Sequence, residues 1–235
     1  MTVDMVFAQP LTRSRLSEEI VAIIQKQIMT GAIAPGAKLP TERELALSLK
    51  VNRATVREAL RKLENLELIE IRHGDGVYAK NYLDSSNLDL IKASFSTDEH
   101  NETIFNVLEV RRIVVPEMAS LAAQRRTDAD LDELEDVILH QEMDMLEKDI
   151  KVNQLIARAG RNPVYTIMQN FIYQITREYS YFYFDHEEEV ERAGRFHHRI
   201  FDAIKRRDAS GARRIMLEAM IHSEERLKKY LAGKH

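Results

Sequence analysis

Three neighbouring stretches decide how the front of this chain folds: LPTERELA at 39–46, VNRATVREAL at 51–60 and IRHGDGVY at 71–78. The first reads as a short helix, the second as a helix with arginines on its exposed face, and the third as a tight basic hairpin. This order predicts a winged helix-turn-helix. In that fold the second of the two helices enters the major groove of DNA, while the hairpin touches the flanking backbone or minor groove.

Capping residues set the expected boundaries of these elements. Thr41 can cap the short helix, with Glu44 in the capping-box position, and that helix is expected to run to about Lys50. Asn52 can cap the next helix, which is expected to end near Leu66. The hairpin is expected to consist of strands at 68–72 and 77–80 around a tip at 74–76.

The rest of the chain reads as helical. An apolar period between Thr12 and Thr30 predicts a helix that Gly31 ends. Beyond residue 90 apolar stripes recur at helical spacing with few glycines, which predicts an antiparallel bundle of six or seven helices, one of them starting at Pro163. The predicted fold class is therefore mainly α with a small β wing. The expected domains are a DNA-binding domain at 10–80, a linker at 81–87 and an all-α effector-binding and dimerisation domain at 88–231.

Composition narrows the class of protein. The hydrophobic fraction of 44% and the charged fraction of 31% are typical of a globular protein. No run approaches the roughly 18 apolar residues of a membrane span, and the first ten residues lack the features of a signal peptide. The absence of cysteine excludes disulfides and thiolate metal sites, and we expect a cytoplasmic protein. Residues 1–80 hold 12 of the 34 basic and 10 of the 38 acidic residues, so the front is net +2 and the remainder net −6.

The predicted DNA-reading surface rests on arginine chemistry. The planar guanidinium donates two parallel hydrogen bonds to guanine edges or phosphates. Arg53 and Arg57 are four residues apart, so they share one face of the helix that Asn52 caps. The alternative is that these are ordinary solvated side chains. The predicted DNA contacts are Arg43, Asn52, Arg53, Thr55, Arg57, His73 and Gly74.

The three stretches at 39–46, 51–60 and 71–78 resemble the GntR family of bacterial transcription regulators. The helical remainder resembles the FadR-type effector domain through LEVRR at 108–112, NPVY at 162–165 and FHHRI at 196–200. The resemblance covers about residues 12–231. It implies a homodimer that binds a short palindromic operator and changes its grip on DNA when a small ligand occupies the helical domain.

The resemblance also implies a divalent metal in the helical domain. Many relatives hold it with an Asp, a His or Asn four residues later, and two further histidines. Asp149, Asn153 and His197 match the first three positions, while the fourth falls near Ala219, which has no donor. His222, one turn further along, is the nearest candidate. Zn²⁺, Ni²⁺ or Mn²⁺ would then anchor a small carboxylate effector; alternatively, Asp149 and Asn153 face solvent.

A second interpretation of the same domain is a lipid pocket. Aromatic residues gather between 173 and 184, and the order of motifs resembles the fatty-acyl-CoA-responsive FadR proteins. Arg111 and Ser223 fall at positions that line the ligand cavity there, and an arginine suits a carboxylate or phosphate. The alternative is plain core or dimer packing of the aromatics. The predicted effector-binding residues are Arg111, Tyr181, His197 and Ser223.

Competing functions are few. The sequence contains no paired general acid and base, no activated nucleophile motif and no phosphate loop, so no enzyme is expected. The rivals are a DNA-binding regulator with an unresponsive bundle, and a metal-dependent hydrolase using Asp149, His197 and a bound water. The expected partners are double-stranded DNA, a second copy of the chain and a small acidic effector, without a membrane. The run at 187–189, three glutamates, is expected to be a solvated helix start.

Overall fold

The computed structural model describes residues 14–94, 100–140, 142–184 and 186–232, without the side chains of residues 14, 15, 100, 101 and 178–183. The chain divides into two compact units, Met1–His100 and Asn101–His235. Among the described residues, no helix is both long and apolar enough to cross a membrane.

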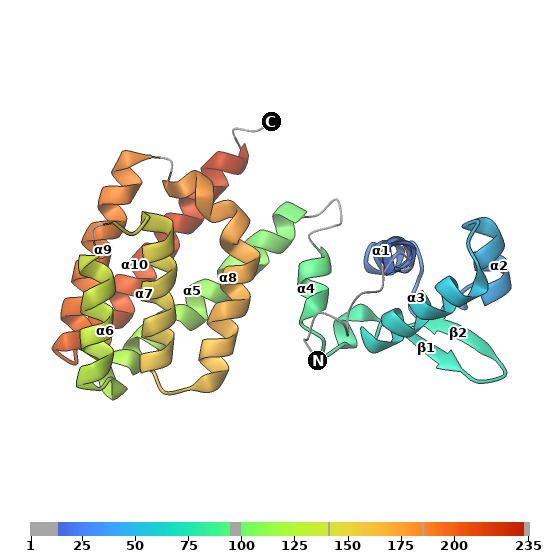
Figure 1. Cartoon of the computed structure of the whole chain (residues 1–235), viewed down its shortest axis with the longest axis horizontal. Helices are drawn as coiled ribbons and strands as arrows, with labels where there is room; N and C mark the ends of the chain where they lie inside the picture. The colour runs from blue at the N-terminus through green and yellow to red at the C-terminus, as the bar shows by residue number, and fades with distance from the viewer. Residues whose placement is uncertain (1–13, 95–99, 141, 185, 233–235) are drawn as a thin grey trace, which may run out of the picture. The chain divides into compact units, whose positions relative to one another are not determined.

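The first unit has the predicted order of helices followed by a hairpin (Figure 1). Thr41 caps α2 with a complete capping box, because its hydroxyl accepts from the Glu44 main chain while the Glu44 carboxylate accepts from the Thr41 main chain. The elements are α1 (Ser14–Met29), α2 (Glu42–Ser48), α3 (Arg53–Asn65), β1 (Ile69–Arg72), β2 (Gly76–Ala79), the 3-10 helix η2 (Tyr82–Asp84) and α4 (Asp89–Ser94).

The core of this unit lies between α1, α3 and the hairpin. Helix α3 buries Val56, Leu60 and Leu63, each at most 1% exposed. Helix α1 packs against α3 with isoleucines at helical spacing, including Ile20 and Ile24. This packing holds the opposite face of α3 toward solvent.

The hairpin is a two-stranded antiparallel sheet in which Ile69 pairs with Ala79. Gly74, at its tip, has φ +79°, a backbone conformation that glycine adopts without strain. Asp75 steadies the tip: its carboxylate accepts from Lys38 at 3.1 Å and from the Tyr78 hydroxyl at 2.9 Å. These hydrogen bonds, with Tyr78 the larger cause, lower the pKa of Asp75.

The segment expected to be a linker contains the 3-10 helix η2. Glu67, which has φ +58°, accepts from the Ser85 hydroxyl at 2.8 Å and from the Ser86 main chain at 2.8 Å. These contacts attach residues 85 and 86 to the end of α3. The role of 81–87 as a domain linker stays a prediction.

The second unit consists, over its described residues, of helices only (Figure 1). Its core includes Met118 from α5, Ile156 from α7, Ile200 from α9 and Met216 from α10, each at most 1% exposed. The helices are α5 (His100–Arg125), α6 (Asp128–Leu139), α7 (Met145–Ala159), α8 (Pro163–Phe184), α9 (Glu187–Lys205) and α10 (Ala209–Ala232). The mainly α fold class with a β wing is thereby confirmed.

Candidate functional site

The start of α3 is built by its N-cap. The Asn52 side chain accepts from the Thr55 main chain at 2.8 Å and from the Thr55 hydroxyl at 3.1 Å. Thr55 is 5% exposed, because its hydroxyl turns back to the cap. The structure thus gives both residues a capping role, and their contact with DNA stays a prediction.

Exposed arginines lie on the two helices of the motif. Arg43 in α2 and Arg53 in α3 are both exposed. Arg57 is exposed too, and its guanidinium makes two parallel hydrogen bonds to Glu42, at 3.0 and 2.8 Å. This contact raises the pKa of Arg57 and lowers that of Glu42. Arg57 therefore ties α3 to α2, so a contact with DNA must share its guanidinium with Glu42 or displace that carboxylate.

The wing presents His73 and Gly74 at its exposed tip. Arg72 is also exposed, and its guanidinium lies 4.3 Å from the centre of the Tyr78 ring while it pairs with Glu70. The sequence prediction included neither Arg72 nor Lys38. Both add positive charge to the hairpin, beside the predicted contact residues.

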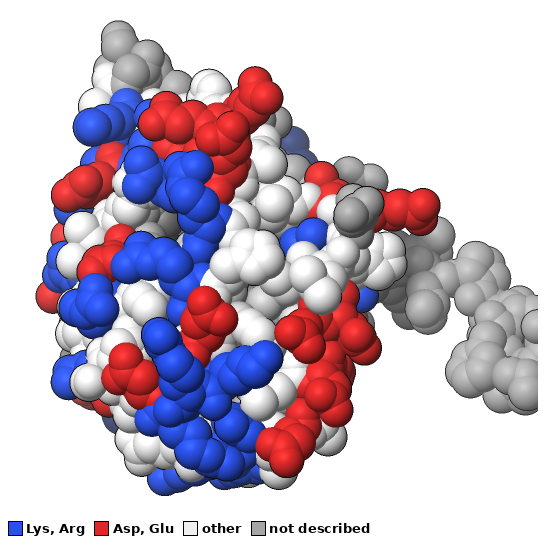
Figure 2. All heavy atoms as spheres, turned by 90° about the vertical axis from the view of Figure 1, so that its left-hand side faces the viewer, with Lys and Arg blue, Asp and Glu red and all other residues white. Residues whose placement is uncertain are grey.

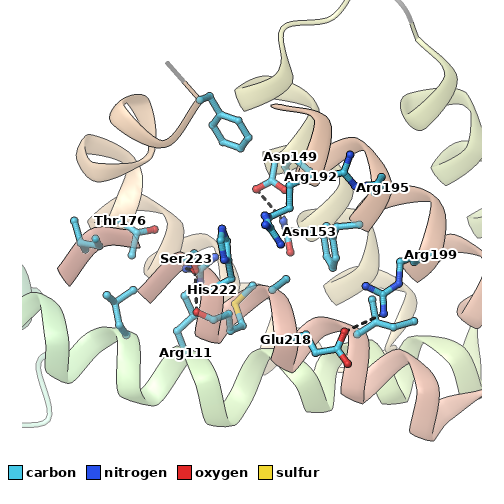
Figure 3. Close-up of a pocket in the computed structure, with 18 of the residues that line it drawn as sticks. Arg111, Asp149, Asn153, Thr176, Arg192, Arg195, Arg199, Glu218, His222 and Ser223 are labelled. Carbon is cyan, nitrogen blue, oxygen red and sulfur yellow. Dashed lines mark hydrogen bonds and ion pairs between the residues drawn. The ribbon is translucent and has the colours of Figure 1, made fainter. Parts of the chain in front are cut away.

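A cavity of about 270 Å³ lies within the helical unit, lined by residues of α5, α7, α8, α9 and α10. Apolar side chains such as Leu108, Met220 and Leu227 form part of its wall. Polar side chains face it from several helices (Figure 3). The labelled polar residues are Arg111, Asp149, Asn153, Thr176, Arg192, Arg195, Arg199, Glu218, His222 and Ser223.

Three of the four predicted metal ligands are brought together. Asp149 Oδ1 lies 3.0 Å from Nε2 of His197, whose ring is 1% exposed. The Asn153 amide donates to the Asp149 main-chain oxygen at 2.8 Å and to Asp149 Oδ2 at 3.2 Å. Both carboxylate oxygens of Asp149 are thus hydrogen-bonded. Asn153 is buried, and Asp149 is about a quarter exposed.

The fourth predicted ligand, His222, faces a different partner. Its Nε2 lies 2.8 Å from Oε2 of Glu189, and Glu189 also pairs with Arg226 at 3.0 Å and Arg192 at 3.6 Å. Glu189 is 3% exposed, so the expectation of a solvated glutamate run is wrong at this position. The phase of α9 turns residue 189 inward, while 187 and 188 stay exposed.

The donor set does not match a transition-metal site of the predicted kind. Across the ranges described, no three His, Cys, Asp or Glu side chains form a group that could hold a metal ion. Asp149 and His197 supply one carboxylate and one imidazole, Asn153 adds only an amide, and the Nε2 atom of His222 is taken by Glu189. Sites for Zn²⁺ and Ni²⁺ are usually richer in imidazole or thiolate.

The predicted effector residues divide into three cases. Arg111 of α5 donates to the Ser223 hydroxyl of α10 at 3.1 Å, and both line the cavity. His197 is buried next to Asp149, which lines the cavity. The side chain of Tyr181 lies outside the described residues.

Sequence reasoning missed the arginines that α9 directs at the cavity. Arg192, Arg195 and Arg199 line it, and they recur at spacings of three and four residues, which is the signal that could have found them. Figure 2 shows Lys and Arg gathered on the side of the helical unit that lies at the left of Figure 1, where α9 is placed. Arg199 pairs with Glu218 at 2.9 Å and Arg195 with Glu191 at 3.3 Å.

A winged helix-turn-helix joined to a helical unit with a cavity of apolar and charged side chains defines a DNA-binding regulator with an effector domain. Comparison with known families agrees with this class. Residues 16–79 match the model of bacterial regulatory proteins of the gntR family, and residues 106–222 match the FCD domain. The chain belongs to the GntR family.

Curated relatives match along most of the chain. The HTH-type transcriptional regulator LutR of Bacillus subtilis is 29% identical over 216 residues, which covers 86% of this chain and 97% of the relative. The galactonate operon transcriptional repressor of Escherichia coli is 29% identical over 224 residues, covering 90% and 96%. These relatives are transcriptional regulators, and this chain is likewise a regulator and not an enzyme.

A solved structure agrees with the fold. The chain is similar to Lar, which controls the expression of the Listeria monocytogenes agr system, with a TM-score of 0.53. The match covers 94% of this chain and 98% of that chain at 14% identity, so it concerns the fold alone.

Proposed function

We propose that this regulator binds a palindromic operator as a homodimer, and that a small organic acid in the helical unit changes its affinity for DNA. One observation supports the effector-binding part of this proposal: in the cavity, Arg111 and Arg192 face a partly apolar wall. The exposed arginines of α2 and α3 support the DNA-binding part.

Reading of the operator is assigned to the start of α3. Arg53 is exposed in the first turn, where it can reach base edges or phosphates without breaking an ion pair that holds the fold. Arg43 and Arg57 add charge beside it, and His73 with Gly74 approach the flanking DNA from the wing. Asn52 and Thr55 fix the first turn of α3. The main-chain amides at this end of the helix favour a phosphate, so they add to the proposed DNA-binding surface.

A homodimer is proposed because the DNA-binding surface of a single chain is small. One short helix reads only a few base pairs, and two copies must be held about 34 Å apart to read two half-sites together. Helix α5 exposes Val110 and Ile113 on consecutive turns, and α8 exposes Val164 and Ile167. We expect the second copy to pack on these exposed apolar side chains of the FCD domain.

The dimer is tested by mass. Light scattering after size exclusion is expected to give about twice the 27.2 kDa of the single chain at micromolar concentration. We expect the aspartate variants Ile113→Asp and Ile167→Asp to lower that mass if they lie in the interface, since a buried unpaired charge is costly. A mass of one chain for the unaltered protein at every concentration would remove the homodimer from the proposal.

The effector is assigned to the class of small organic acids and not to fatty acyl-CoA. The cavity, at about 270 Å³, is slightly smaller than usual ligand pockets, which run from roughly 300 to 1,000 Å³. A long acyl chain joined to a nucleotide exceeds that space. The galactonate operon repressor, a relative by sequence, is named for a sugar acid, and this agrees with a small polar acid here.

We propose that the site binds the acid through side chains alone, without a metal. Arg111, held by Ser223, gives a carboxylate a fixed charged donor, and Arg192 adds a second. The predicted metal has no place in the proposal because His222 and Ala219 leave the fourth position without a free ligand. We propose that binding of the acid shifts helices of the helical unit, and that the segment 81–87 transmits this shift to the two wings.

Replacing Arg111 with glutamine is expected to weaken binding of the acid by about 1.5–3 kcal/mol, or roughly 10- to 150-fold, because a charged hydrogen bond is lost. Isothermal titration of the acid that best stabilises the unaltered protein, chosen by thermal shift from a panel, measures this. Arg213→Gln is the matched control, since Arg213 is 60% exposed, pairs with Glu117 and is not among the residues that line the cavity. Equal loss in both variants would show that only general charge matters and would contradict the assignment of Arg111.

A further inference from the structure

One carboxylate lies among the exposed arginines of α3. Arg53, Arg57 and Arg61 recur every four residues along this helix, and all three are exposed. Glu42, in the first turn of α2, accepts two hydrogen bonds from Arg57, at 3.0 and 2.8 Å. Helices α2 and α3 pack against each other (Figure 1), which brings Glu42 to this face of α3. The phosphates of DNA would therefore approach a surface that already holds a negative charge.

The Glu42 carboxylate is ionised at neutral pH. The hydrogen bond from Arg57 is the main reason that its pKa is lowered, and the positive charges of Arg53 and Arg61 lower it further. The same contact raises the pKa of Arg57, so both members of the pair stay charged. Since three arginines of α3 act on this one carboxylate, Glu42 lies close enough to reduce the positive potential of the whole exposed face.

The contact with Glu42 leaves one edge of the Arg57 guanidinium group available. A guanidinium group has five N–H donors, and the two hydrogen bonds to Glu42 use Nε and Nη2. Within the described part of the chain, the two N–H groups of Nη1 have no acceptor. Arg57 can thus donate to a phosphate from Nη1 while Glu42 holds the other edge. A guanidinium group fixed in this way loses little conformational freedom when it binds.

We infer that Glu42 increases the preference of this regulator for its operator over other DNA, because it holds Arg57 in one direction and repels phosphates. This inference rests on the proposed DNA-binding surface of α3. Binding to DNA of any sequence comes almost entirely from attraction between cations and phosphates, whereas sequence preference comes from contacts to bases. A negative charge weakens the first kind of binding. On the operator, the fixed direction of Arg57 offsets that repulsion, so Glu42 is a positioning residue that acts through Arg57.

The test compares the unaltered full chain with Glu42→Gln, which removes the charge and keeps the size of the side chain. Fluorescence anisotropy follows binding to a duplex that the protein enriches from a random library, and to a shuffled duplex of the same composition, at about 50 to 200 mM salt. We expect the variant to bind the shuffled duplex roughly threefold or more tighter, and the slope of log affinity against log salt to be steeper by about 0.9, because Arg57 is released to neutralise a further phosphate. The ratio of the two affinities is expected to fall by a similar factor.

Glu117→Gln is the matched control. Glu117 of α5 pairs with Arg213 at 2.7 Å and its side chain is 39% exposed, against 2.8 Å and 34% for Glu42. This control changes the net charge of the chain by the same amount, but it lies in the helical unit. We expect it to leave both affinities and the salt dependence as they are in the unaltered protein. Circular dichroism checks that both variants are folded.

A second pair of variants tests whether Glu42 acts through Arg57. With Arg57→Gln already in place, the further change Glu42→Gln is expected to alter the salt slope and the ratio of affinities much less, since no guanidinium group is released. A fall in the ratio as large as the one seen with Arg57 present would overturn the inference, because Glu42 would then act by repulsion alone.

The remaining outcomes separate the inference from the proposed function. If the unaltered chain prefers the enriched duplex and Glu42→Gln leaves the ratio and the salt slope unchanged, the inference is wrong and the proposed DNA-binding surface stands. Weaker binding of the variant to the enriched duplex alone, with an unchanged salt slope, also overturns the inference, since the carboxylate would then contact a base. If the unaltered chain prefers no duplex, both the inference and the proposed function are wrong.

Discussion

Replacing Arg53 with alanine is expected to weaken binding to the operator by about 1–3 kcal/mol, or roughly 5- to 150-fold, if its guanidinium contacts a base. The expectation follows from its place in the first turn of α3, exposed and next to the cap that Asn52 builds. Fluorescence anisotropy with a duplex enriched by the protein from a random library measures the change.

The Arg53 result is distinguished from a general loss of charge by Arg206→Ala. Arg206 is an exposed arginine of the helical unit, at the end of α9. We expect this control to leave affinity for the duplex within about twofold. An Arg53 variant that binds the duplex as tightly as the unaltered protein, with an unchanged footprint, would remove Arg53 from the reading surface.

Replacing Leu60 with alanine is expected to lower the free energy of unfolding of the DNA-binding unit by about 2–5 kcal/mol. Leu60 is 1% exposed and lies in the core that α3 shares with α1. Removal of its side chain leaves a cavity that close-packed neighbours fill only in part. Since a domain is stable by only about 5–15 kcal/mol, this loss also lowers the fraction able to bind DNA.

Leu47→Ala is the matched control for Leu60. Leu47 lies in α2 and is 70% exposed, so the same change of side chain there is expected to cost less than about 0.5 kcal/mol. Urea unfolding followed by circular dichroism compares the two variants. A loss of similar size at both positions would contradict the packing described for α3.

The sequence predicted those parts of the fold that local chemistry determines. The capping box of Thr41 and Glu44, the Asn52 cap and the helix start at Pro163 are all found, because each depends on residues within one turn of the other. The strands of the wing begin one residue away from the predicted positions. Mainly α architecture followed from apolar periodicity alone.

Other parts of the site depend on contacts far apart in the sequence. Glu189 lies in a run of three glutamates, and only the packing of α10 against α9 shows that it is buried against His222 and Arg226. Thr55 is polar and near a helix start, yet its hydroxyl serves the cap. Spacing along the chain identified Asp149, Asn153 and His197 as neighbours, but it did not reveal that one amide oxygen of the three stays without a partner.

The measurement that tests the central claim most directly is the affinity of the full chain for its selected duplex with and without the bound acid. Anisotropy titrations at saturating acid are expected to change the dissociation constant about tenfold or more, which requires a difference of only about 1.4 kcal/mol in the acid's binding free energy to the free and DNA-bound forms. The Arg111→Gln variant is expected to show no such change at the same acid concentration. An acid that binds the protein by calorimetry and leaves the dissociation constant for DNA unaltered would contradict the account.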